Sequence, residues 1–156
     1  MKMSDLDQRL ARKNLQGFWA MEVQSSEKKP YLWKWDDIYE SLQLASEHVP
    51  MDQTGRRAIM VRNPYISGGI TETLNVSIQL VKPAEIAKAH RHTSSVVYQV
   101  FRGRGVTQVE GYTLSWNQGD IFVVPSWKWH GHENPFQEDA ILFSLNDWPA
   151  LQALGL

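Results

Sequence analysis

The sequence contains no cysteine, almost no net charge and no long apolar segment. Without cysteine the 156 residues can form neither disulfides nor thiolate metal sites, and the composition fits a reducing compartment, which predicts a cytoplasmic protein. A formal net charge of −1 gives no electrostatic basis for binding nucleic acid or an anionic membrane. No apolar run is long enough to cross a bilayer, and residues 1–20 are too charged for a secretory signal. We therefore expect neither nucleic acid nor a membrane as partner.

Tryptophan, in contrast, is abundant, with seven residues in a chain long enough for about one domain. Large aromatic side chains favour burial, so this number indicates an aromatic-lined cavity, an interface or both.

The apolar pattern divides the chain near residue 55. In residues 1–55 we expect a helical arm, with one helix capped by Ser4 and a second that begins at Asp36 or Asp37 and ends near His48. In residues 56–148 apolar residues alternate in short runs separated by glycine, asparagine and proline, which is typical of a β-sandwich or barrel. Residues 149–156 fit a final helical turn. The expected strands are residues 58–61, 73–81, 86–92, 96–101, 106–110, 121–124, 129–133 and 140–145.

Three histidines are the candidate functional residues of this barrel. His90 and His92 are two apart on an expected strand, so their imidazoles point to one side. His130 could join them if the chain folds back, and three neutral imidazoles would hold a divalent metal with positions left open. The alternative is that these are ordinary core or surface histidines. His132, two residues after His130, is a candidate catalytic acid or base or a residue of the rim.

Two separated motifs resemble the signatures of the cupins. His90-x-His92 followed by Gly103 resembles the first signature, and the series Gly119, Pro125, His130 and Asn134 resembles the second in both residue type and spacing. The resemblance implies an all-β fold, a double-stranded β-helix (jelly-roll) barrel with the three histidines facing its interior. Two positions differ: the usual glutamate ligand falls on Val96 or Val97, and a usual glycine is Trp127.

Within the cupins, residues 89–93, 103–105, 120–127 and 142–147 resemble the gentisate 1,2-dioxygenase group, which includes salicylate and 1-hydroxy-2-naphthoate dioxygenases. That group uses three histidines and no carboxylate, and its members are bicupins about twice this length. This chain resembles their N-terminal arm joined to their second barrel. The resemblance implies Fe(II), O2 and a hydroxylated aromatic carboxylate whose ring is opened. Because a single barrel exposes a flank that a bicupin covers, we also expect a homodimer or larger homo-oligomer.

The resemblance also suggests substrate contacts. A family glutamine is retained as Gln79, but an aromatic residue is replaced by Asn75, a glycine by Ser77 and a carboxylate-binding arginine by Tyr98. Another arginine could substitute, with Arg57, Arg62, Arg102 and Arg104 as candidates. The predicted substrate-binding residues are Gln79, Tyr98, Arg104, Trp116, Trp127 and Trp129.

Three functions remain open from the sequence. The first is an Fe(II)-dependent ring-cleaving dioxygenase of the gentisate 1,2-dioxygenase type. The second is a metal-binding cupin without that activity, either a small-molecule sensor or a remnant of a bicupin enzyme. The third is a non-redox cupin enzyme, such as an isomerase, that uses another metal.

Overall fold

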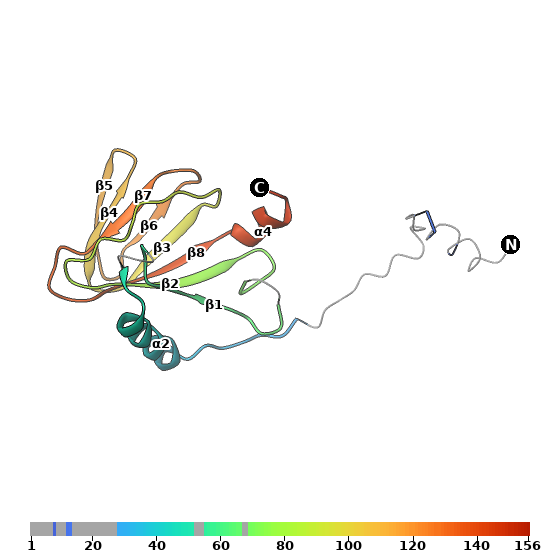
Figure 1. Cartoon of the computed structure of the whole chain (residues 1–156), viewed down its shortest axis with the longest axis horizontal. Coiled ribbons are helices and arrows are strands. Elements are labelled where there is room, and N and C mark those ends of the chain that lie inside the picture. Colours follow the sequence, from blue (N-terminus) through green and yellow to red (C-terminus); the bar gives the residue numbers. More distant parts are fainter. Residues whose placement is uncertain (1–7, 9–11, 14–27, 52–54, 67–68) are drawn as a thin grey trace.

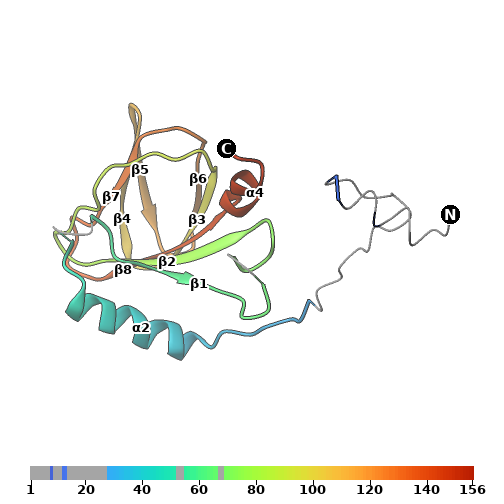
Figure 2. The ribbon, with the colours of Figure 1, turned by 45° about the vertical axis from the view of Figure 1, so that its right-hand side comes forward.

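Two antiparallel sheets form the body of the molecule in this computed structural model, which describes residues 8, 12–13, 28–51, 55–66 and 69–156. A five-stranded sheet has the order β1-β2-β8-β3-β6, and a three-stranded sheet has the order β5-β4-β7. Figures 1 and 2 show the two sheets curving around a common interior. The strands are β1 (Ala58–Val61), β2 (Asn75–Val81), β3 (Val96–Arg102), β4 (Arg104–Val109), β5 (Tyr112–Asn117), β6 (Ile121–Val124), β7 (His130–Glu133) and β8 (Ala140–Asn146). The all-β barrel expected from the sequence is confirmed.

Alternation along the strands separates the interior of the barrel from its outer surface. In β3, Val96, Tyr98 and Val100 are buried while Val97 and Gln99 are exposed, as expected for a strand with one face inside. The inward side chains form one core between the sheets, which also contains Trp116 from β5. Glycine at position 105 of β4 is required here, because a Cβ atom would stand 2.3 Å from the Trp116 ring.

A second core lies outside the five-stranded sheet, beneath helix α2 (Trp35–His48). Leu42 of the helix is fully buried against strand residues that include Ile78 and Leu80. Strand β2 is therefore covered on both faces, which explains why almost all of its residues are buried. Figure 2 shows α2 lying along the side of β1 and β2.

The helices agree with the sequence prediction except at the start of α2. The helix begins at Trp35, so Asp36 and Asp37 lie in its first turn, where they complement the helix dipole instead of capping it. A short helix, α4 (Trp148–Ala153), follows Asp147, and Gly155 then adopts a φ of 76°. The expected helix at Ser4 lies outside the described residues. No helix in the described ranges has the length and apolarity needed to traverse a bilayer.

Two strand predictions were wrong. Residues 86–92 do not form a strand and make only isolated bridges, Ile86 with Glu133 and His90 with His130. Strand β5 was missed, although Tyr112, Leu114 and Trp116 alternate along it after a turn at Gly111. Most residues of β5 are exposed and only Trp116 is buried, so the strand has too few apolar residues to produce a clear alternating pattern.

Candidate metal centre

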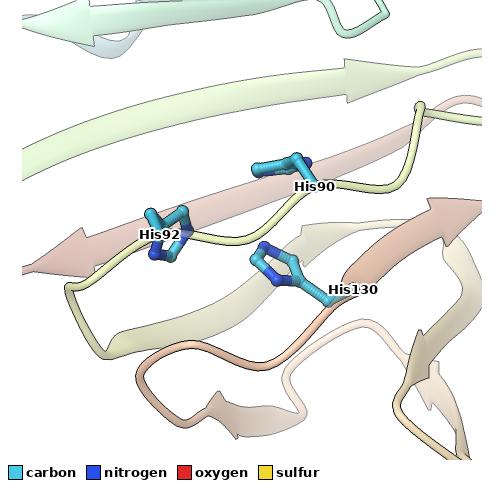
Figure 3. Close-up of side chains that lie close together, drawn as sticks. All are labelled: His90, His92 and His130. Atoms are coloured by element: carbon cyan, nitrogen blue, oxygen red, sulfur yellow. The ribbon is translucent and has the colours of Figure 1, made fainter.

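His90, His92 and His130 meet in the interior of the barrel. His130 is the first residue of β7, whereas His90 and His92 lie in the irregular segment before β3. The backbone N–H groups of His90 and His130 each donate to the other's carbonyl oxygen at 2.9 Å, which places the two residues opposite each other. One ring nitrogen from each of the three residues lies within 4.8 Å of the others. Figure 3 shows the three rings turned toward a common point.

The loop before β7 holds this irregular segment in place. The N–H of Trp127 donates to the His92 carbonyl at 2.8 Å, and the Arg91 guanidinium lies 5.3 Å from the Trp127 ring and 5.2 Å from the Trp129 ring. Arg91 thus points away from the histidines and joins the two ligand-bearing segments through cation–π contacts. Trp127 has a φ of 62°, in the left-handed region that favours glycine, which accounts for the glycine usual at this cupin position.

Hydrogen bonds assign the same tautomer to the three imidazoles. The Nδ1 atoms lie near backbone carbonyl oxygens, of Lys88 at 3.1 Å for His90, of Lys128 at 2.9 Å for His130 and of Ser94 at 2.8 Å for His92. A carbonyl only accepts, so each Nδ1 carries the proton and each Nε2 keeps its lone pair. The His130 Nε2 is buried and has no partner among the described residues. Three such nitrogens fit a divalent transition metal, with carbonyl partners that orient the rings.

Burial keeps the histidines in the neutral form that a metal requires. Desolvation lowers the pKa of His130 to about 4 and also lowers the pKa of His90. Desolvation, and to a lesser extent the neighbouring His130, lowers the pKa of His132 to about 3. The rings of His90, His130 and His132 are therefore uncharged at neutral pH.

Arg56 stands beside the three histidines, and the sequence analysis did not select it. Its Nη1 atom donates to His90 Nε2 at 2.9 Å. The adjacent Arg57 points to the other side of the extended chain and forms a bidentate ion pair with Glu85, with both distances 2.9 Å. The sequence analysis considered Arg57 as a substrate contact, but its ion pair with Glu85 holds it away from the histidines. Neighbouring side chains of an extended chain point to opposite sides, and this alternation was the signal that could have identified Arg56 instead.

A cavity of about 360 Å3 opens next to the histidines. Of the predicted substrate-binding residues, Gln79 and Tyr98 line it. Arg104 instead pairs with Glu138 at 3.3 Å, and Trp127 and Trp129 are half exposed around Arg91. The lining residues are Arg56, Ala58, Met60, Asn75, Ser77, Gln79, His90, His92, Ser94, Val96, Tyr98, Ser144, Asn146 and Trp148.

His132 lies deep in the barrel, not at its rim, and is only 1% exposed. Its Nδ1 atom is 2.8 Å from the Thr107 hydroxyl, which accepts a hydrogen bond from the Trp116 indole N–H at 2.9 Å. The Thr107 hydroxyl has its own proton available for Nδ1, which places the His132 proton on Nε2. That Nε2 is buried without a partner among the described residues. Trp116 is thus placed behind His132 and not in the wall of the cavity.

Comparisons with known proteins agree with this barrel and site. Residues 77–146 match the family model described as cupin domain. A 5-aminosalicylate 1,2-dioxygenase of a Comamonas species is 48% identical over 94 residues, which cover 60% of this chain and 25% of the relative. A gentisate 1,2-dioxygenase of a Streptomyces species is 35% identical over 129 residues, which cover 80% of this chain and 36% of the relative.

A solved structure gives the same result. Salicylate 1,2-dioxygenase from Pseudoaminobacter salicylatoxidans, in adducts with gentisate, superposes with a TM-score of 0.85 at 26% identity, over 99% of this chain and 45% of that one. The chain therefore contains a cupin domain, as its two signatures predicted. Within the cupins it is related to the gentisate and salicylate 1,2-dioxygenases. The chain spans from 25% to 45% of the length of these relatives.

Proposed function

We propose that this chain is an Fe(II)-dependent ring-cleaving dioxygenase that acts on a hydroxylated aromatic carboxylate. The observation that carries the proposal is the meeting of three imidazole ring nitrogens and one guanidinium at a cavity large enough for a small aromatic acid. His90, His92 and His130 would hold the iron. When bound, the iron would be chelated by two oxygens of the acid and would pass electron density from the acid to O2.

Arg56 has the role of binding the substrate carboxylate. Its guanidinium donates to the His90 Nε2 lone pair. With that lone pair bound to a metal, the guanidinium would turn from the ring to the carboxylate, with which it can form charge-assisted hydrogen bonds. Arg56 thereby replaces the family arginine that the sequence lacks at Tyr98.

Tyr98 lines the cavity and is a further candidate contact for the substrate. Burial raises the pKa of Tyr98, so its hydroxyl stays protonated and can donate a hydrogen bond. His132 does not line the cavity; its ring centroid lies 4.9 Å from that of Tyr98 and 6.0 Å from that of His130, so its role would be to position these two residues. Val96 and Tyr98 line the cavity and help to exclude water, and the Phe122 ring stacks on Tyr98 with centroids 4.8 Å apart.

The direct test is O2 uptake. The protein is purified without added metal, loaded anaerobically with Fe(II), and mixed with salicylate, gentisate, 5-aminosalicylate and 1-hydroxy-2-naphthoate in air-saturated buffer. We expect O2 consumption with at least one acid and matching loss of its aromatic absorbance. Tight metal binding without O2 uptake by any acid would contradict the proposal.

The second candidate is a metal-binding cupin that binds an aromatic acid without cleaving it. It is favoured by one observation, the presence of Tyr98 where the family resemblance expects a carboxylate-binding arginine. The same assay distinguishes the two candidates, because a sensor would bind the acids and consume no O2. Turnover with zinc or nickel and without O2 use would instead indicate a non-redox enzyme.

We also propose that the protein forms a homodimer or larger homo-oligomer. Strand β6 is an edge strand of the five-stranded sheet, and Val97, Ile121 and Val123 on its outer side are 44%, 68% and 54% exposed. Such adjacent apolar side chains favour contact with another copy. Light scattering should give at least a dimer mass, and Val123→Lys should lower it. A monomer at high concentration would contradict the proposal.

A further inference from the structure

Two buried amide side chains face the cavity with atoms that have no hydrogen-bond partner. Asn75 is 6% exposed and Gln79 is 7% exposed, and neither the Asn75 Oδ1 nor the Gln79 Nε2 finds a partner among the described residues. Buried polar atoms are nearly always paired in folded proteins. Because both residues line the cavity, the missing partners are expected to come from the bound molecule.

The two amides lie at opposite ends of one strand face. Asn75, Ser77 and Gln79 are spaced by two along β2, so Asn75 and Gln79 share the interior face at a separation of about 13 Å along the strand. Ser77 between them is already bonded to the Ser144 hydroxyl at 2.7 Å. The unsatisfied atoms therefore mark two separate positions in the cavity.

Arg56 lies near the end of this strand face that carries Gln79. In the antiparallel pair β1–β2, Ala58 is opposite Gln79, and the Leu80 N–H donates to the Arg57 carbonyl at 3.0 Å. Pairing thus continues toward Arg56, away from Asn75. At the other end, Asn75 is opposite Asn146, whose Oδ1 is already occupied by the Trp148 N–H at 3.1 Å. An acid whose carboxylate lies near Arg56 would extend its ring toward Asn75.

We propose that Asn75 is a specificity-determining residue that recognises a hydrogen-bonding substituent, hydroxyl or amino, on the side of the aromatic ring away from the carboxylate. The inference rests on the proposed function, which supplies the ring and the carboxylate. Asn75 Oδ1 accepts a hydrogen bond from the substituent, and Gln79 Nε2–H donates to the carboxylate end. A ring that bears an apolar group there leaves Asn75 buried and unpaired, which weakens its binding.

The test compares substituents of similar size on the metal-loaded protein without O2. Calorimetry measures the affinities of gentisate, 5-aminosalicylate and 5-methylsalicylate, the last of which has no hydrogen-bonding group at that ring position. We expect the unaltered protein to bind the first two about tenfold more tightly than the methyl compound. Asn75→Leu, which nearly preserves side-chain shape, should remove or reverse this preference. Asn117→Leu makes the same replacement at an exposed position of β5 and should retain it.

Equal affinities of the three acids for the unaltered protein would overturn the inference, as would an unchanged preference in Asn75→Leu. The proposed function would survive either result if O2 is still consumed. If none of the acids binds the loaded protein, the proposed function and the inference fail together. The ligand series on the unaltered chain decides the matter even if the variant does not fold. Thermal unfolding of a folded Asn75→Leu should show no loss of stability, since the replacement removes an unpaired buried atom.

Discussion

The interior of the barrel has a packed end and a hollow end, built by the same strands. On the inward faces of β2, β8 and β3, the packed end presents Val81, Leu142 and Val100, which are almost fully buried in one apolar cluster. The hollow end presents Asn75 and Ser144, which line the cavity. The alternation of side chains along each strand determines which residues face the interior. The size and polarity of those residues determine whether they fill the interior or line a cavity.

The histidines lie at the hollow end, on segments with little regular structure. Only His130 is in a strand, and residues 86–92 pair with β7 only through the isolated bridges Ile86–Glu133 and His90–His130. The packed end thus stabilises the two sheets, while cation–π contacts and single hydrogen bonds hold the three histidines in place. The predictions below compare the effects of changes at the two ends.

The largest effect is expected from removing a histidine of the hollow end. His130→Ala takes away one of three ligands and should lower metal affinity at least about 100-fold, measured by competition with a chromophoric chelator. O2 uptake should be lost with it. The thermal stability of the metal-free protein should change little or rise, because an unpaired buried nitrogen disappears. Retained tight metal binding would remove His130 from the proposed ligand set.

A substitution at the packed end should lower the free energy of unfolding. Leu142→Ala leaves a cavity in the fully buried core and should lower the free energy of unfolding by about 2–5 kcal/mol. Ser144→Ala, two residues along the same strand at the hollow end, should cost no more than about 1 kcal/mol. Urea unfolding of the metal-free variants measures both. Equal losses would mean that the two ends are not energetically distinct.

Acid should destabilise the metal-free protein through the buried imidazoles. The pKa values of His130 and His132 in the folded protein are lowered to about 4 and about 3, whereas the unfolded chain takes up protons near pH 6.5. The unfolded state therefore binds more protons below pH 6.5, and stability should fall by a few kcal/mol as the pH drops from 6.5 toward 4. The free energy of unfolding should become independent of these two groups about one pH unit above 6.5.

The control for this pH dependence is a pair of histidine variants. His132→Leu should reduce the slope of unfolding free energy against pH, because it removes a buried titrating ring. His48→Leu removes an exposed ring at the end of α2 and serves as the matched variant. A slope equal in the unaltered protein and His132→Leu would show that other groups cause the acid sensitivity.

The smallest effect is expected at Arg56. Arg56→Ala should raise the KM for the aromatic acid about 10- to 100-fold through the loss of charge-assisted hydrogen bonds, with a smaller change in kcat. Arg56→Lys should recover part of the loss. Arg104→Ala, which removes an exposed partner of Glu138 outside the cavity, should leave both constants unchanged. A KM unaffected by Arg56→Ala would exclude it as the carboxylate contact.

Most of the strands and the grouping of the three histidines could be predicted from the sequence. Strands β1 and β6 begin and end where alternation and turn residues predict, and the structure brings together the three histidines that the motifs singled out, although the segment of His90 and His92 is not a strand. The grouping was predicted from the order of the motifs and not from strand geometry.

The rest of the site depends on contacts between distant segments. Arg56 lies 34 residues before His90, and nothing local distinguishes it from Arg57 until Glu85 is seen to take the latter. Trp127 and Trp129 were predicted to bind the substrate as aromatic walls of its pocket. Their rings instead enclose Arg91, a partner on another segment.

The ion pair of Arg57 with Glu85 has a kinetic consequence. Glu85 is held in turn by the Lys82 N–H at 2.8 Å, so the backbone that carries Arg56 is fixed on its far side by three short hydrogen bonds. The guanidinium of Arg56 can then exchange partners only through rotation about its own side-chain bonds. Such rotations take picoseconds to nanoseconds, far less than a loop rearrangement, so capture of an acid at this position would not limit the turnover rate.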